Sequence, residues 1–209
     1  MTPRCASHLV AVAFSAGGLQ PLIHLLHALP ADFASAIAVV HHAGSVSCLP
    51  DLLSNQTALT VKFAECGETL LDGTVYVCPP LHHLLVNPDA TVGLSSNARL
   101  SYVRPSADWF FRTVAGSFDA RAAAVVLSGA SNDGAKGISK VFEAGGQIFV
   151  QDPQTCMFPT MPQAALDAAR SCGVHAPDEL GPALIAASQQ RDLTTAQAEW
   201  DHPFGPIAA

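Results

Sequence analysis

Three side chains of this sequence have the types needed for a hydrolytic site, and each follows a short apolar segment. They are Ser15, one of the adjacent His41 and His42, and Asp133. A serine hydroxyl becomes a useful nucleophile when a base accepts its proton. A histidine base needs a further group that fixes its tautomer and stabilises its charged form. If the apolar segments are strands of one parallel sheet, the three side chains meet at one edge of it, which indicates nucleophilic catalysis.

The residues after Ser15 form a turn with two glycines, Gly17 and Gly18, in "FSAGG". Glycines allow sharp backbone geometry and leave N–H groups free at the start of the next helix, where they could stabilise a phosphate or an oxyanion. A nucleotide site is the weaker interpretation, because the chain has no G-x-G-x-x-G or G-K-[ST] pattern. Ser15 could also serve only as the cap of that helix.

The other two side chains also have structural alternatives. His42 could line a loop, and Asp133 could cap the helix that it precedes, which is the commoner role of aspartate in an N-D-G sequence. The coincidence of all three residue types at one edge favours catalysis more than any of them does alone.

Two pairs of adjacent histidines, at 41/42 and 82/83, raise the alternative of a zinc site, because imidazole is the commonest zinc ligand. The chain has no H-x-x-x-H or H-E-x-x-H spacing, and neighbouring side chains of an extended chain point to opposite faces. His24 and His27 fit the face of a helix better than a ligand set. We therefore expect no metal site and no cofactor.

The elements that must position these residues are predicted from apolar runs that are too short for buried helices and lack the alternation of half-exposed strands. Such runs are typical of a parallel sheet covered on both faces. Helical patterns fall between them, and strand and turn residues around "NPDA" predict an antiparallel hairpin beside the sheet. The expected fold is a three-layer, doubly wound α/β fold with a mainly parallel sheet. The predicted strands are 9–14, 36–40, 122–129 and 146–152, the helices 18–30 and 133–146, and the strand and hairpin region 74–95.

The length of 209 residues suits one domain, which we expect over 1–190, followed by a C-terminal tail at 191–209. The formal charge of −7 argues against a nucleic-acid partner. No apolar run approaches the length of a membrane span, and no secretory signal is present, so we expect a cytosolic protein without membrane insertion.

Charged residues make up 13% of the chain, about half the usual share of roughly 25%, which favours an apolar docking face. The six cysteines form no C-x-x-C pair, and we expect them to be reduced and mostly buried.

Six motifs occur in an order that resembles the catalytic domain of the chemotaxis-specific protein-glutamate methylesterases, the CheB-type family. In chain order they are "FSAGG", "VVHHAG", "YVCPPLHH", "RPSAD", "LSGASNDG" and "FPTMP", within about residues 8–188. The resemblance implies that Ser15 is the nucleophile, His42 the base and Asp133 the residue that orients it. It also implies that the substrate is a methylated glutamate of a chemoreceptor, which is hydrolysed to glutamate and methanol.

The sequence departs from the family pattern beside the implied nucleophile. Ala16 replaces a threonine, Ala130 and Ser131 replace Met-Gly, and "AG" at 43–44 replaces Met-Pro. About eight residues precede the first predicted strand, so we expect no receiver domain in this chain. The alternative function is therefore a catalytically weak or inactive relative that acts as a protein-binding module in chemosensory signalling.

Overall fold

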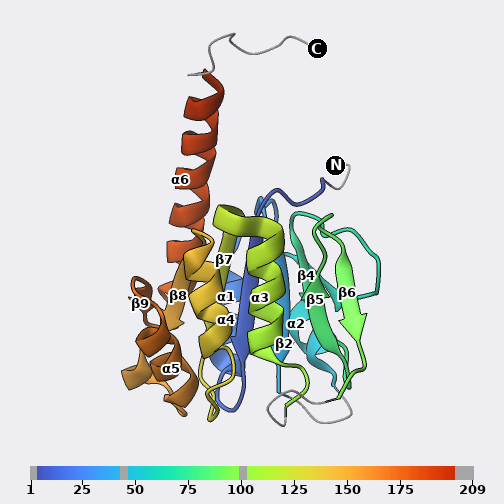
Figure 1. Cartoon of the computed structure of the whole chain (residues 1–209), viewed down its shortest axis with the longest axis vertical. Helices are drawn as coiled ribbons and strands as arrows, with labels where there is room; N and C mark the ends of the chain where they lie inside the picture. The colour runs from blue at the N-terminus through green and yellow to red at the C-terminus, as the bar shows by residue number, and fades with distance from the viewer. Residues whose placement is uncertain (1–3, 43–46, 99–102, 201–209) are drawn as a thin grey trace.

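A seven-stranded, entirely parallel sheet forms the centre of the computed structural model, which describes residues 4–42, 47–98 and 103–200, with side chains described as far as Gln190 (Figure 1). In spatial order its strands are β3 (Thr60–Phe63), β4 (Thr74–Val77), β2 (Ala36–His41), β1 (Leu9–Phe14), β7 (Ala122–Val126), β8 (Gln147–Gln151) and β9 (Gly173–His175). The predicted strands and the predicted doubly wound α/β class are confirmed.

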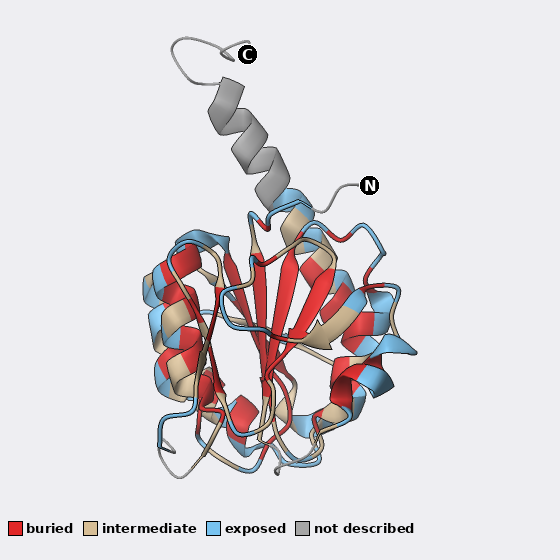
Figure 2. Ribbon diagram, turned by 90° about the vertical axis from the view of Figure 1, so that its right-hand side faces the viewer, coloured by how far each residue is buried: buried red, intermediate tan, exposed pale blue. Residues whose placement is uncertain are grey.

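Helices cover both faces of the sheet, so the central strands are buried on both sides (Figure 2). One face carries α1 (Leu19–Ala28), α2 (Leu49–Ser54) and α6 (Leu180–Trp200), and the other carries α3 (Ala107–Phe118), α4 (Ala135–Glu143) and α5 (Thr160–Ala168). Two short 3-10 turns, Asp119–Arg121 and Pro153–Thr155, precede β7 and follow β8. This double cover explains the unbroken apolar runs of the sequence.

The two faces of the central strands differ in side-chain size. Alanines of β1, β2 and β7 face α3, whose Phe110 and Phe111 are fully buried among them. Valines and isoleucine of the same strands face α1 and α2. The small residues let α3 lie close to the sheet with its large rings filling the space, which brings the first turn of α3 close to the strand ends.

The predicted antiparallel hairpin is confirmed as β5 (His83–Val86) and β6 (Val92–Ser95). It is attached to α3, because the Thr113 hydroxyl accepts a hydrogen bond from the Val86 N–H at 3.1 Å and the Ser117 hydroxyl donates to the Val86 carbonyl at 3.0 Å. β4 joins the parallel sheet and not the hairpin. Sequence analysis missed β3 and β9, two short, partly exposed edge strands without a long apolar run.

Helix α6 crosses the predicted domain boundary at residue 190. Its Leu180 and Leu184 are buried, and Gly181 lies against Ala28 of α1, yet the helix continues beyond the sheet to Trp200 (Figure 1). The division into a domain and a tail remains a prediction. Among the described residues, no helix has both the length and the apolar character needed to cross a membrane.

The prediction of mostly buried cysteines is wrong. All six are free thiols, but Cys5, Cys48 and Cys66 are exposed, and only Cys78 is fully buried. The exposed thiols lie in connecting segments outside the sheet, where no core packing encloses them.

Two glycines inside helices offer a matched test of how closely α3 and α4 pack. A Cβ on Gly137 of α4 would lie 2.6 Å from the Phe111 Cβ and 2.8 Å from the Asp108 carbonyl, whereas a Cβ on Gly116 of α3 would have no neighbour within 4 Å. We expect Gly137→Ala to lower the free energy of unfolding by about 1–3 kcal/mol. Gly116→Ala should raise it by about 0.5–1 kcal/mol, because it only restricts the unfolded chain. Urea denaturation of both variants checks this, and stabilisation by Gly137→Ala would contradict the close packing.

Candidate functional site

Ser15 lies directly after β1, at the point where the order of the strands reverses. β1 pairs with β2 on one side and with β7 on the other, and ligands of open parallel sheets bind at such a switch point, beyond the carboxyl ends of the strands. The Ser15 N–H donates to the Ser128 carbonyl at 2.9 Å, and the residue is partly exposed. Its backbone is therefore fixed while its side chain reaches the edge of the sheet.

His42 follows β2, the neighbour of β1, and its ring is held by Asp133. The His42 N–H donates to the Phe14 carbonyl at 3.4 Å, and its ring Nε2 lies 3.0 Å from the Asp133 Oδ2. The adjacent His41 points the other way and stacks on Phe14, with ring centroids 5.2 Å apart. The structure thus brings together two of the three predicted residues at the end of the strand beside Ser15.

Asp133 is fixed by the first turn of α3. Its two carboxylate oxygens accept hydrogen bonds from the Ser106 hydroxyl at 3.1 Å, the Ala107 N–H at 2.6 Å and the Asp108 N–H at 3.1 Å, in addition to the His42 bond. The N-terminus of a helix favours a negative charge, so this position suits an ionised carboxylate. Only 4% of the Asp133 side chain is exposed.

The alternative role predicted for Asp133, as the cap of the helix that it precedes, is filled by another residue. That helix is α4, and its Gly134 and Gly137 N–H groups donate to the Asp108 Oδ1 at 3.0 and 2.9 Å. Asp133 therefore caps α3, the helix that contains Asp108, and Asp108 caps α4, the helix that Asp133 precedes. This exchange links the start of α3 to the start of α4.

The protonation state of the pair follows from these contacts. Burial by itself would raise the pKa of Asp133, but the hydrogen bonds from His42, Ala107 and Asp108 hold this pKa below its ordinary value. An ionised carboxylate only accepts hydrogen bonds, so the His42 Nε2 must carry the donated proton. In a neutral ring this leaves the lone pair on Nδ1, which can accept a proton.

The Ser15 Oγ forms no hydrogen bond with any described residue, His42 included. The predicted contact between the Ser15 hydroxyl and the second ring nitrogen of His42 therefore stays a prediction. Catalytic hydrogen bonds are often formed only when substrate is bound.

His83 holds Ser106, the residue that caps α3, and both of its ring nitrogens are used in hydrogen bonds to the backbone. The Ser106 N–H donates to its Nδ1 at 3.1 Å, and its Nε2 pairs with the Ala98 carbonyl at 3.3 Å. Burial lowers the pKa of His83, so its ring is neutral and holds the residue that caps α3. His24 and His27 are exposed on α1, as predicted, and no three potential ligands cluster within the part of the chain that the structure describes.

Sequence analysis missed Ser128, which holds the turn after Ser15. The single proton of this fully buried hydroxyl is shared between the Ala16 carbonyl at 2.8 Å and the Phe158 carbonyl at 3.2 Å, and the oxygen accepts from the Phe158 N–H at 3.0 Å. The fully buried Gln151 accepts from the Ser128 N–H at 3.0 Å. No sequence signal distinguishes these residues from ordinary strand-end polar residues, because their partners are distant in the chain.

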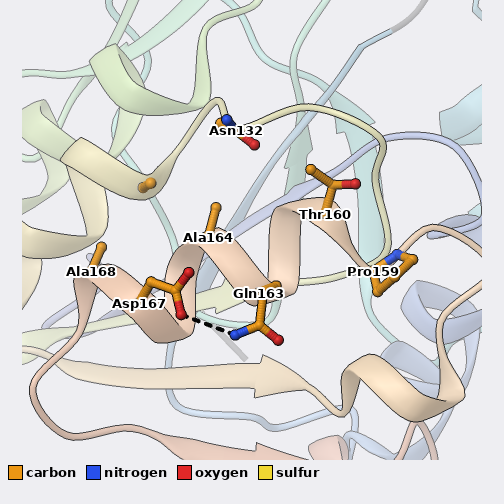
Figure 3. A pocket seen from close by; sticks show the side chains of 8 residues that line it. Asn132, Pro159, Thr160, Gln163, Ala164, Asp167 and Ala168 are labelled. Carbon is orange, nitrogen blue, oxygen red and sulfur yellow. Dashed lines mark hydrogen bonds between the residues drawn. The ribbon is translucent and has the colours of Figure 1, made fainter.

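Two hollows flank the strand ends. A groove of about 670 Å³ runs between α4 and α5, from Asn132 beside Asp133 to Asp167 and Ala168 (Figure 3). A smaller hollow of about 310 Å³ borders Gly17 and the exposed Met157 on the other side. The smaller hollow therefore borders the turn after Ser15, and the groove begins beside Asp133.

Comparison with known proteins identifies the family. The pattern described as CheB methylesterase matches residues 10–184, and the chain belongs to this family. Protein-glutamate methylesterase/protein-glutamine glutaminase 4 of Myxococcus xanthus (strain DK1622) is 38% identical over 180 residues, which cover 85% of this chain and 51% of that protein. Protein-glutamate methylesterase FrzG of Myxococcus xanthus is 35% identical over 179 residues, which cover 85% of this chain and 54% of FrzG.

The chain spans about half the length of these two curated relatives. The crystal structure of the Thermotoga maritima CheB methylesterase catalytic domain superposes with a TM-score of 0.80 at 29% identity, covering 86% of this chain and 98% of that domain. The resemblance of the sequence to the catalytic domain of this family is confirmed.

Replacing Ser128 tests how firmly the Ser15 turn is held. Ser128→Ala leaves the Ala16 carbonyl and the Phe158 N–H without their buried partner, so we expect a loss of about 1–3 kcal/mol of unfolding free energy. Ser139→Ala on α4 is the matched control, because the Ser139 hydroxyl only donates to carbonyls at 3.3 and 3.4 Å. Urea denaturation measures both. Equal losses would show that Ser128 does not hold the turn.

Asp133→Asn should destabilise the protein in a pH-dependent way. At pH 7 the NH₂ group of the variant's amide would face hydrogen-bond donors of α3 or of His42, and two donors cannot pair. We therefore expect the free energy of unfolding to fall by about 1–3 kcal/mol. Because folding lowers the pKa of Asp133, its stabilisation is complete above the ordinary aspartate pKa of about 3.9 and is lost as the pH falls through the lower folded value. The difference between the natural protein and the variant should therefore shrink below about pH 4.

Denaturation curves at several pH values measure this difference. Asp167→Asn is the control, because Asp167 is exposed and, among the described residues, accepts only from Gln163; its effect should stay within about 0.5 kcal/mol. A difference for Asp133→Asn that is independent of pH would contradict the charged form of Asp133.

Proposed function

We propose that this chain is a serine esterase that hydrolyses glutamyl methyl esters of a chemoreceptor to glutamate and methanol, with Ser15 as nucleophile, His42 as base and Asp133 as its orienting partner. The single observation that carries this proposal is the 3.0 Å contact between His42 Nε2 and Asp133 Oδ2 at the end of the strand beside Ser15. The family to which the chain belongs supplies the class of ester.

In the first half of the reaction, the Ser15 Oγ attacks the ester carbonyl carbon while the His42 Nδ1 accepts the hydroxyl proton. The imidazolium ion that forms keeps its Nε2–H on the Asp133 carboxylate, which stabilises the positive charge. Collapse of the tetrahedral intermediate breaks the bond to the methoxy oxygen, and His42 returns the proton to it. Methanol leaves, and an ester between Ser15 and the glutamyl side chain remains.

In the second half, a water molecule attacks this ester and His42 accepts a proton from the water. When the second tetrahedral intermediate collapses, the proton passes to the Ser15 Oγ. The product is the glutamate side chain, which ionises at neutral pH. The same histidine nitrogen therefore serves both halves, which requires that Asp133 hold the ring in one orientation.

The negative oxygen of both intermediates needs N–H donors, and the backbone beside Ser15 provides them. The N–H groups of Ala16 and Ala130 make no hydrogen bond to a described residue, although the backbone around them is fixed through Ser128 and Gly129. A donor of this kind contributes about 10²- to 10³-fold to the rate. Since every residue except proline has an N–H, the replacement of longer side chains by Ala16 and Ala130 leaves this function intact.

Ala16 and Ala130 are both exposed, so their small side chains widen the surface around the site and do not alter its buried supports. We infer that they change how the protein substrate is positioned. The second candidate, a weak or inactive binding module, is favoured by this altered surface alone. It predicts receptor binding without methanol release.

Ser15→Ala is the direct test of the proposal. We expect it to reduce methanol release from a methylated receptor to background, because no other group would form the acyl-enzyme, while the unfolding free energy changes by less than about 1 kcal/mol at this partly exposed turn. The rate of the natural protein should fall in acid, because a protonated base cannot accept the proton of Ser15.

The measurement is methanol release at equal protein concentrations, together with a denaturation curve for each protein. Full activity of Ser15→Ala would refute the nucleophile. Receptor binding by the natural protein without release above the Ser15→Ala level would favour the binding module.

A further inference from the structure

A hollow of about 610 Å³ lies beside the first turns of α3 and α4. It is lined by Asn97, Ala98, Ser106, Asp108, Trp109, Arg112 and Lys136. Two of these residues, Ser106 and Asp108, donate hydrogen bonds to the Asp133 carboxylate. The hollow is therefore separated from the His42–Asp133 pair by a single layer of residues.

Two positively charged side chains, Arg112 and Lys136, line this hollow against one carboxylate, that of Asp108. Arg112 and Lys136 are exposed, and neither forms an ion pair with an acidic residue in the described part of the chain. The other two lysines differ, because Lys62 is paired with Glu65 and Glu68, and Lys140 with Glu143. Two unpaired cations around one hollow contrast with the formal charge of −7 of the whole chain.

The remaining lining groups suit the apolar stem of an anionic side chain. The N-termini of α3 and α4 at the hollow are capped by Asp133 and by the Asp108 Oδ1, so the positive charge open to a ligand is that of Arg112 and Lys136. The half-buried Trp109, whose ring lies 5.0 Å from that of His83, and Ala98 provide an apolar wall. A glutamate side chain has this combination of methylene groups and a terminal carboxylate.

We propose that this hollow binds an acidic side chain of the protein substrate that lies near the ester in its sequence, so that the enzyme prefers glutamyl esters with acidic neighbours. This inference rests on the proposed function and names the sequence feature by which the substrate is selected. Attraction between the two cations and the carboxylate positions the ester at Ser15 and leaves the chemistry of Ser15 unchanged. The product of the reaction is itself a glutamate, so each hydrolysed ester creates an acidic neighbour for esters close to it.

The test uses two synthetic peptides that each carry one glutamyl methyl ester and differ only in flanking residues, which are glutamates in one and glutamines in the other. The proteins are the natural chain, Arg112→Gln, Lys136→Gln and the double variant. Lys140→Gln is the matched control, because it removes the same charge from the same helix one turn further along. The quantity measured is the ratio of kcat/KM for the acidic peptide to that for the neutral peptide.

We expect a ratio of about five to ten for the natural protein at low salt, reduced by roughly twofold to threefold for each cation removed. The double variant should show no preference, Lys140→Gln should keep it, and all proteins should hydrolyse the neutral peptide at similar rates. High salt should weaken the preference. An unchanged ratio in the double variant, or an equal loss in Lys140→Gln, would overturn the proposal.

A binding experiment separates this proposal from the proposed function. The Ser15→Ala protein, with Trp200→Phe so that Trp109 is its single tryptophan, is titrated with the acidic peptide while Trp109 fluorescence is recorded. If the peptide binds only when Arg112 and Lys136 are present, and the natural protein hydrolyses no ester, the binding of acidic side chains at the hollow is supported and the esterase is refuted. Hydrolysis of the acidic and the neutral peptide with equal kcat/KM would support the esterase and refute the binding of acidic side chains at the hollow. Inorganic phosphate that competes at the same concentration as the peptide would overturn the assignment to a carboxylate side chain.

Discussion

The Asp133 carboxylate is the point on which the rest of this site depends. It is nearly fully buried and has four hydrogen-bond donors, three of them from the first turn of α3 and one from His42. A buried negative charge is costly unless such donors surround it, so the sequence must supply the helix start at that position. Once α3 holds the carboxylate, the position of the His42 ring and the nitrogen that carries its proton follow.

The same requirement accounts for much of the packing around the site. α3 reaches the strand ends because alanines of the central strands leave room for its buried phenylalanines. Asp108 of α3 in turn caps α4, and Gly137 of α4 allows the two helices to approach closely. The two helix starts are therefore linked through Asp108 and through close packing, and Asp133 accepts hydrogen bonds from one of them and directly precedes the other.

Ser15 is positioned by a separate set of contacts. Ser128 holds both sides of it, through its carbonyl to the Ser15 N–H and through its hydroxyl to the Ala16 carbonyl. The nucleophile proposed here and its proposed base thus rest on different supports, the end of β7 and the start of α3. This independence explains how the surface residues Ala16 and Ala130 can differ from the family pattern while the His42–Asp133 contact persists.

The sequence alone determined the elements that carry the site. Unbroken apolar runs require strands buried on both faces, the glycines after Ser15 require a sharp turn, and parallel strands place their following loops at one edge. Local pattern could therefore name Ser15, Asp133 and the His41–His42 pair, and the resemblance to the family selected His42 from that pair. Only the tertiary structure decided which partners those residues have. Asp133 caps α3 and not the helix that it precedes, Ser128 holds a turn more than a hundred residues away, and Arg112 and Lys136 meet at one hollow. Periodicity and spacing describe neighbours along the chain, whereas these contacts join residues that only the packing of α3, α4 and the central strands brings together.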